Sequence, residues 1–171
     1  VDNVLAAAAA AWRLGVPLEL VRLGLETFPA GMTGSPGRFN LLSLDGTGIV
    51  CDYGHNPASL EQICECIAKL PHDRLTAVYS AAGDRRDDDI LAQGRMLGRL
   101  FGRVVVYEDA YMRGRQPGEI TRLLAQGIRE AMPRHRPAEA AFGGTWTEAA
   151  ALVLDSCRPG DLVLLDRKST R

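Results

Sequence analysis

The sequence predicts an α/β fold with a Rossmann-like, mostly parallel sheet of about six strands and one antiparallel edge strand. Two observations predict it. From residue 57 onward, amphipathic helical segments alternate four times with short apolar segments, the pattern of parallel strands joined by right-handed helical crossovers. Before that alternation, the turn signal Asp45-Gly46-Thr47-Gly48 separates two apolar segments, which predicts a hairpin whose first strand lies at the antiparallel edge.

The first part of the chain is predicted to be helical and separate from the sheet. An alanine-rich helix is expected over residues 2–14, ending at Gly15, and a leucine-containing helix over residues 18–27. The segment Pro29 to Gly37 holds three glycines and two prolines, which is typical of a linker. We therefore expect two domains, residues 1–30 and residues 31–171.

The remaining elements follow in chain order. The hairpin strands are predicted at residues 39–44 and 49–52. The later helices are predicted at residues 57–69, 87–101, 117–131 and 145–156, and the later strands at 75–80, 103–107, 139–142 and 161–165. Apolar residues recur at helical spacing in these helices, and the later strands are short and apolar, as buried parallel strands are.

Composition excludes several classes of function. The 20 basic and 21 acidic side chains nearly balance, which argues against a nucleic-acid-binding or polybasic membrane surface. The sequence shows no signal peptide and no apolar run of membrane-spanning length, so a cytoplasmic protein is expected. The four cysteines and three histidines lack the spacing of a zinc site, so we expect reduced, mostly buried thiols and no metal ligands in this chain.

The richest motif is Asp-Tyr-Gly-His-Asn-Pro at residues 52–57, preceded by Pro-Gly-Arg-Phe at residues 36–39. It predicts a strand that ends in a polar turn and continues into a helix, with Asn56 as the cap and Pro57 at the first helical position. Open α/β sheets place ligand-binding groups at such turns.

The side chains of this motif also have purely structural interpretations. Arg38 suits a solvated linker position, Asp52 a turn, and His55 a structural hydrogen-bond donor, while Asn3 suits an exposed first helical turn. Asn56 is explained as a helix cap even without a ligand.

Together the two motifs resemble the start of the C-terminal domain of Mur-type ligases, a family that includes peptidoglycan-precursor ligases, folylpolyglutamate synthase and the cyanophycin synthetases. The resemblance runs from Asn3 to about Leu165, with Gly54 where the family more often has alanine. Asn3-Val4-Leu5-Ala6-Ala7 resembles the helix that closes the family's central, ATP-binding domain, which assigns residues 1–30 to that domain. The phosphate-binding loop of that domain is absent from this sequence, so the 171 residues alone are expected to be inactive.

The resemblance implies a role for each of these residues. The chain would be part of an ATP-dependent C–N ligase that forms amide bonds through an acyl phosphate. Arg38 would contact the ATP phosphates and act in catalysis, and Asp52 would accept the ribose hydroxyls. Asn3, His55 and Asn56 would be further nucleotide contacts, and Mg²⁺ would be bound mainly by the central domain.

Two charged loops follow neighbouring strands. Residues 83–89 read Gly-Asp-Arg-Arg-Asp-Asp-Asp, and residues 108–115 read Glu-Asp-Ala-Tyr-Met-Arg-Gly-Arg. The helix macrodipole explains the three aspartates at 87–89, which open a helix. The other charges predict either a solvated surface or a pocket for a zwitterionic amino acid, formed by Asp84, Arg85, Arg86, Glu108, Asp109, Arg113 and Arg115.

Within the family, both loops most resemble those of cyanophycin synthetases. The resemblance implies that arginine is joined to the β-carboxylate of an aspartate backbone, so the expected partners are an amino acid and a carboxylate polymer or peptide acceptor, with a homo-oligomer formed through a longer chain. Lysine or a diamino acid stays open as the amine. The alternatives are another Mur-type ligase, such as folylpolyglutamate synthase or a peptidoglycan ligase, and a non-catalytic nucleotide-binding or interaction domain.

Overall fold

The computed structural model of the chain describes residues 2–29, 31–32, 34–54, 56–132, 139–142 and 144–166. The chain divides into two compact units, residues 1–36 and residues 37–171. The division falls inside the segment that the glycines and prolines mark as a linker.

The first unit consists of two helices, α1 (Asp2–Arg13) and α2 (Leu18–Glu26). After α1 the chain turns at Gly15, whose φ of +88° lies in the region that glycine adopts without strain. None of the side chains described in this unit is buried. Large apolar side chains are exposed along both helices: Val4, Leu5, Trp12, Leu14, Leu18, Leu20, Leu23 and Leu25. The two helices therefore do not form a core of their own.

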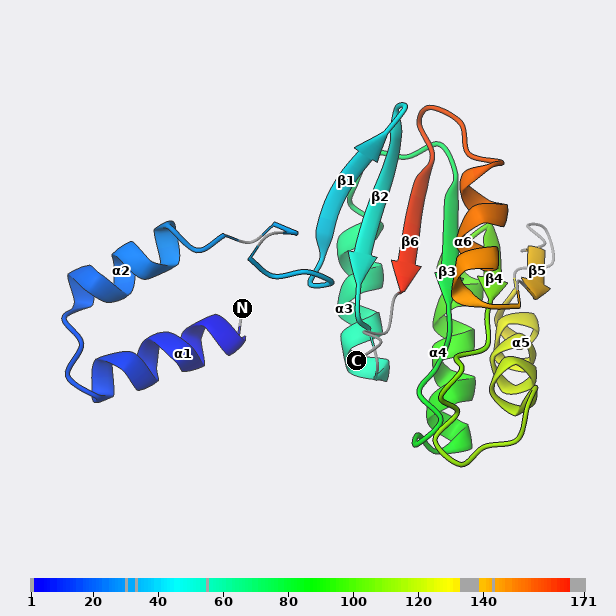
Figure 1. The fold of residues 1–171 in the computed structure, drawn as a ribbon, viewed down its shortest axis with the longest axis horizontal. Coiled ribbons are helices and arrows are strands. Elements are labelled where there is room, and N and C mark those ends of the chain that lie inside the picture. Colours follow the sequence, from blue (N-terminus) through cyan, green and yellow to red (C-terminus); the bar gives the residue numbers. More distant parts are fainter. Residues whose placement is uncertain are drawn as a thin grey trace. The chain divides into compact units, whose positions relative to one another are not determined.

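The second unit is built on one six-stranded sheet in the order β1-β2-β6-β3-β4-β5 (Figure 1). The strands are β1 (Asn40–Leu44), β2 (Thr47–Asp52), β3 (Leu75–Tyr79), β4 (Arg103–Val106), β5 (Glu139–Phe142) and β6 (Leu162–Asp166). β1 pairs antiparallel with β2 at one edge, and every other pairing in this sheet is parallel. The predicted fold class is confirmed.

Helices cover both faces of the sheet. They are α3 (Pro57–Ile67), α4 (Asp87–Leu100), α5 (Glu119–Ala131) and α6 (Trp146–Leu154). Successive strand residues point to opposite faces, so Val50 packs in one core cluster with α3, α4 and α5, while its neighbour Ile49 packs in a second cluster with α6. The sheet is therefore buried on both faces, as its apolar strands predict.

The hairpin turn is shorter than predicted. Only Asp45 (φ +49°) and Gly46 (φ +80°) form it, and β2 begins at Thr47, which pairs with Leu44. Two successive residues with positive φ match the twist of a two-residue hairpin, so Thr47 and Gly48 enter the strand.

Glycines bring α4 and α5 into backbone contact. A Cβ added at Gly94 would lie 2.5 Å from the carbonyl oxygen of Leu124, and one added at Gly127 would lie 2.3 Å from that of Leu91. This contact fixes the spacing of the two helices, and the charged loops at 83–86 and 108–118 lead directly into them.

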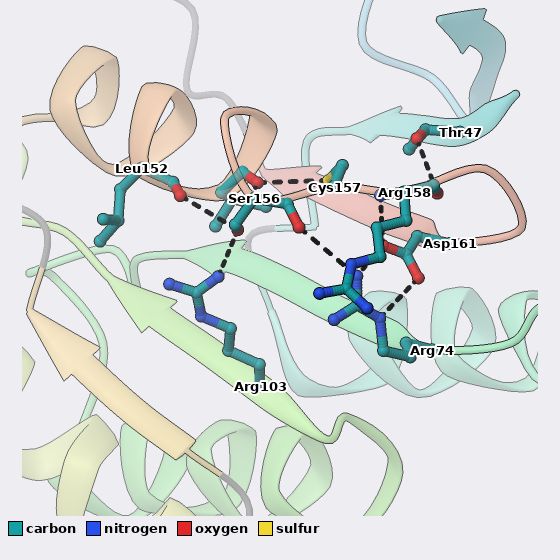
Figure 2. A network of polar contacts seen from close by, with 9 residues as sticks. Thr47, Arg74, Arg103, Leu152, Ser156, Cys157, Arg158 and Asp161 are labelled. Carbon is teal, nitrogen blue, oxygen red and sulfur yellow. Dashed lines mark hydrogen bonds and ion pairs between the residues drawn. The ribbon is translucent and has the colours of Figure 1, made fainter. Parts of the chain in front are cut away.

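A polar network joins the segments that open the strands, at the amino end of the sheet (Figure 2). Asp161 accepts hydrogen bonds from the guanidinium of Arg74, with Nε at 2.7 Å, and from the backbone N–H of Arg158 at 2.8 Å. Thr47 Oγ1 donates to the carbonyl oxygen of Arg158 at 3.1 Å. The starts of β2, β3 and β6 are thereby tied together around one carboxylate.

The cysteines are free, but the expectation of mostly buried thiols is wrong. Cys66 is exposed and the other three are half-buried. Two of the four lie on helix α3 and one on the segment after α6, both at the surface of the unit, and Cys51 lies on β2. Burial, followed by the charge of Glu61, raises the pKa of Cys64 to about 12, so this thiol stays protonated. Among the helices that are described, none has the length and apolarity to cross a membrane.

Candidate functional site

The two motifs that the sequence singles out are joined by hydrogen bonds at the carboxyl end of β2. The backbone N–H of Phe39 donates to Asp52 Oδ2 at 2.7 Å, and the N–H of Tyr53 donates to the carbonyl oxygen of Gly37 at 3.0 Å. Phe39 has a φ of +48°, which folds the segment back on the strand end. The Arg38 Cζ atom then lies 6.0 Å from the centroid of the Tyr53 ring.

This arrangement presents Arg38 to solvent as an available cation. The side chain is exposed, and no carboxylate pairs with it among the residues described. The Tyr53 ring provides a cation–π contact. A planar guanidinium held in this way suits the oxygens of a phosphate, while the half-buried Asp52 holds the main chain that carries it.

The predicted cap at residue 56 is confirmed. Asn56 Oδ1 accepts the backbone N–H of Ser59 at 2.8 Å, and Pro57 occupies the first position of α3. His55 lies outside the described residues, and Asn3 is an exposed residue of α1 in the first unit. The nucleotide-binding roles of Asn3, His55 and Asn56 therefore stay predictions.

Sequence reasoning missed a tyrosine beneath the motif. Tyr79 ends β3, is fully buried, and donates from its hydroxyl to the carbonyl oxygen of Gly54 at 2.7 Å; Gln93 Oε1 lies 3.1 Å from the same hydroxyl. Burial raises the pKa of Tyr79, with further increments from Asp166 and other neighbours, so the hydroxyl remains a donor. The one signal in the sequence was a tyrosine at the end of a mostly apolar strand.

It also missed Asp166, because the last strand was predicted to stop at residue 165. Asp166 ends β6 in register with Asp52 on β2, so two carboxylates occupy neighbouring strand ends. Asp166 is buried, and its Oδ2 lies 3.4 Å from the N–H of Ser80. Its carbonyl oxygen accepts hydrogen bonds from the side chains of Tyr107 and Trp146, at 3.2 and 3.0 Å.

The two charged loops meet at the carboxyl ends of β3 and β4. Arg113 Nη1 donates to Asp84 Oδ2 at 2.7 Å. Desolvation opposes ionisation of Asp84, but the hydrogen bond and charge of Arg113 outweigh it, so the pKa of this carboxyl is lowered. Both side chains are largely exposed, so this pair contributes little to stability.

Arg115 joins the same two loops through a largely buried side chain. Its side chain is only 13% exposed. Nε donates to the carbonyl oxygen of Gly83 at 3.0 Å, Nη1 to Asp87 Oδ1 at 2.6 Å and Glu119 Oε1 at 2.5 Å, and Nη2 to the carbonyl oxygen of Arg85. A guanidinium with this many acceptors is a structural connection between the loops.

The approach of the loops depends on glycine at position 83. A Cβ there would lie 2.0 Å from the carbonyl oxygen of Met112. The facing loop turns at Arg113 and Gly114, which have φ values of +51° and +89°. The backbone itself therefore brings the two loops together.

The remaining candidates differ in their surroundings. Glu108 Oε1 accepts the N–H of Gly118 at 2.6 Å, and Asp109 Oδ1 accepts the N–H of Tyr111 at 3.1 Å, so both carboxylates order their own loop. Arg85 Nε lies 4.0 Å from Asp84 Oδ1 and has no hydrogen-bond partner within the described chain. Arg86 pairs with Asp89 at 3.2 Å on the exposed surface of α4.

No metal centre is formed by the described parts of the chain, since no three histidine, cysteine or acidic side chains in them lie close enough to share an ion. What the carboxyl end of the sheet does present is a phosphate-compatible cation at Arg38, two carboxylates at adjacent strand ends, and a loop pair that carries both signs of charge. These groups suit an anionic nucleotide beside a zwitterionic ligand.

Comparison with known proteins identifies the class. Residues 37–166 match the family model described as "Mur ligase, glutamate ligase domain", and the chain belongs to that family. It is 37% identical to the cyanophycin synthetase of Crocosphaera subtropica over 165 residues, which cover 96% of this chain and 18% of that protein.

Peptidoglycan ligases are also similar. The chain is 32% identical to UDP-N-acetylmuramoyl-L-alanyl-D-glutamate--2,6-diaminopimelate ligase of Synechococcus elongatus, covering 97% of this chain and 32% of that protein. The crystal structure of MurF from Acinetobacter baumannii has a TM-score of 0.66 at 21% identity, covering 95% of this chain and 32% of that one, and shares the fold. The chain thus spans only a fifth to a third of the length of these relatives.

Proposed function

We propose that this chain is part of an ATP-dependent C–N ligase that joins arginine to the side-chain carboxylate of an aspartate backbone. The observation that carries the proposal is the loop pair at residues 83–87 and 108–119, which presents carboxylates and guanidiniums beside the Arg38–Asp52 motif. The similarity to cyanophycin synthetases extends over both loops.

The reaction has two steps. The γ-phosphoryl group of ATP passes to a carboxylate oxygen, giving an acyl phosphate and ADP. The amine nitrogen then attacks the acyl carbon; a C–N bond forms, the C–O bond to phosphate breaks, and the amine loses a proton. Positioning and charge stabilisation supply most of the catalysis in phosphoryl transfer.

In this proposal Arg38 neutralises charge on the phosphoryl oxygens. Its position follows from the hydrogen bond of Asp52 to Phe39 and from the Tyr53 ring. Asp52 also serves the ribose, with Asn3, His55 and Asn56 as further nucleotide contacts. Mg²⁺ is assigned to the part of the enzyme that binds the ATP phosphates, outside this chain.

The amine substrate is assigned to the loop pair. Asp84, Glu108 and Asp109 supply negative charge for a guanidinium, and Arg85, Arg86 and Arg113 supply positive charge for a carboxylate. Arg115 is assigned a positioning role, because its donors are already engaged by Gly83, Arg85, Asp87 and Glu119.

We assign residues 1–30 to the end of the central domain and residues 31–171 to the C-terminal domain. The exposed apolar side chains of α1 and α2 support this, since two helices without a buried core need a further surface to pack on. Closure of the two domains about the Pro29–Gly37 segment would assemble the site.

The test is ATP consumption by the full-length protein given an oligo-aspartate primer and a panel of amino acids. Arginine-dependent phosphate release, with a matching gain of arginine mass on the primer, is expected. Arg38→Ala should lower turnover by about 100-fold, the usual cost of removing a transition-state donor. Arg99→Ala, which removes an exposed α4 cation outside the site, is the matched control.

One alternative has a specific observation behind it. The 32% identity to a diaminopimelate-adding ligase covers nearly the whole chain, so a peptidoglycan precursor with a diamino acid belongs in the panel. Phosphate release that depends on the peptidoglycan precursor and a diamino acid, or on glutamate and a folate, would support the same ligase chemistry with different substrates. No release with any pair would favour a non-catalytic nucleotide-binding domain.

A further inference from the structure

A groove of about 290 Å³ runs between α5 and the edge strand β5. Its floor is apolar, formed by Val106, Ala125, Ala140 and Ala141, and Phe142 stands at its side with 59% of its surface exposed. β5 is the last strand of the sheet and pairs only with β4 among the strands described (Figure 1). No described strand occupies its other edge, where an extended chain can add.

Two arginines line this groove. Arg122 and Arg129 are seven residues apart on α5, which places them on one face of the helix about 10 Å apart along its axis. Both are exposed, and neither forms an ion pair with any described residue. No carboxylate is among the described lining residues.

The nearby carboxylates of α5 are engaged elsewhere. Glu119 receives Arg115, and Glu130 receives Arg95 at 2.8 Å and Gln126 at 2.9 Å. The positive charge of the groove is therefore not compensated by its own helix, although α5 carries acidic residues at both ends.

We propose that this groove holds the acidic acceptor chain while one of its carboxylates reacts. An extended peptide adds to an open strand edge through backbone hydrogen bonds, and guanidiniums bind carboxylates along it. The 10 Å between the two arginines corresponds to about three residues of extended chain. This inference rests on the proposed function, because it assigns the groove to the aspartate-backbone acceptor of that reaction.

The groove is continuous with the loop assigned to the amine. Gly118 lines its end, and the N–H of Gly118 is held by Glu108 at 2.6 Å. An acceptor chain lying along α5 thus leads to the carboxyl end of the sheet, where the acyl group would meet the amine.

The experiment uses the full-length protein and a fluorescein-labelled oligo-aspartate of about ten residues, long enough to span the groove. Fluorescence anisotropy without ATP should show that Arg122→Gln/Arg129→Gln raises the Kd about tenfold, with a shallower salt dependence. In the ligase assay the primer KM should rise similarly, while the KM values for ATP and arginine and the turnover at saturating primer stay unchanged. The control is Lys69→Gln/Arg99→Gln, which removes two exposed charges outside the groove.

Several outcomes would overturn the inference. Equal loss in both double variants would mean a diffuse effect of net charge, and competition by single-stranded DNA as strong as by oligo-aspartate would mean a general anion surface. If the Arg122→Glu/Arg129→Glu variant is an active ligase with an unchanged primer KM, the groove does not bind the acceptor, and the proposed function is unaffected. The opposite result would be binding of oligo-aspartate that still depends on the two arginines, without arginine-dependent phosphate release. It would keep the groove as a binding site for an acidic chain and contradict the proposed function.

Discussion

The two ends of the sheet use arginine–carboxylate pairs whose carboxylates differ strongly in burial. At the amino end, Asp161 is 6% exposed and holds both Arg74, whose own side chain is 52% exposed, and the main chain of Arg158. At the carboxyl end, Asp84 is 48% exposed and holds only the side chains of Arg113 and, more distantly, Arg85. The buried Asp161 carboxylate is part of the fold, whereas solvent leaves the second pair able to exchange partners.

Further contacts also differ between the two ends of the sheet. At the amino end, Arg103 donates to Ser156 Oγ at 2.6 Å, and Arg74 donates to the Ser156 carbonyl oxygen at 3.4 Å, so β3 and β4 are tied to the segment after α6 (Figure 2). At the carboxyl end Arg115 is 13% exposed, and it connects loops instead of strands. The fold is thus secured at the amino end, whereas the charged side chains of the carboxyl end are largely exposed.

The largest effect on stability should follow from breaking the Arg74–Asp161 pair. Asp161→Ala removes the acceptor for the half-exposed Arg74 and for the Arg158 N–H, and we expect the free energy of unfolding of the second unit to fall by about 2 kcal/mol. Urea denaturation followed by circular dichroism measures it. Asp84→Ala is the control at the other end and should change stability by less than about 0.5 kcal/mol. Equal losses in the two variants would contradict the contrast.

Next in size is the loss of the loop connection. Arg115→Ala should raise the KM for the amino acid about tenfold, or about 1.4 kcal/mol, because the loops at 83–87 and 108–115 are no longer joined. The KM for ATP should stay unchanged, and Arg115→Lys should restore only part of the loss, since lysine lacks the fork. Arg99→Ala, on the exposed surface of α4 and outside the site, is the control for removing an arginine. A rise in both KM values would mean that Arg115 supports the site as a whole.

Most of the fold could be predicted because it depends on local patterns. The alternation of apolar strands and amphipathic helices, the Asp45-Gly46 turn and the Asn56-Pro57 helix start are all encoded within a few residues. Strand ends were less predictable. Asp166 continues β6 although an aspartate favours a turn, because it pairs with Asp52 of the neighbouring strand β2.

The sequence predicted which residues belong to the candidate site but not which of them contact one another. Arg38 and Asp52 stand out in the sequence, yet the hydrogen bond that joins their segments spans thirteen residues. Arg115 bonds the carbonyl oxygen of Gly83, thirty-two residues away, and Tyr79 reaches Gly54 from another strand. Such contacts depend on which strands become neighbours, and no local pattern states that.

A smaller effect should come from the buried tyrosine beneath the motif. Tyr79→Phe keeps the ring but leaves the Gly54 carbonyl oxygen unpaired in the interior, which should cost about 1 kcal/mol of stability. Because Gly54 lies between Asp52 and the start of α3, the KM for ATP should rise while that for the amino acid does not. Thermal unfolding and steady-state kinetics measure the two. Thr76→Val, a substitution on the same strand away from its carboxyl end, is the control.

The smallest effect is the pH dependence of the stability that the Arg74–Asp161 pair contributes. The hydrogen bond from Arg74 is the main cause that lowers the pKa of Asp161, against the opposing effect of burial. A lowered folded-state pKa means that the contribution to stability is fully present above the unfolded-state pKa of about 3.9 and is lost as pH falls through the folded-state value. The stability difference between the wild type and Asp161→Asn should therefore be constant above about pH 5 and shrink below about pH 4, as measured by urea midpoints. Asp84, Glu119 and the other carboxylates with lowered pKa values cancel in this difference, so a gap that stays constant into acid would show that the charge of Asp161 does not stabilise the amino end.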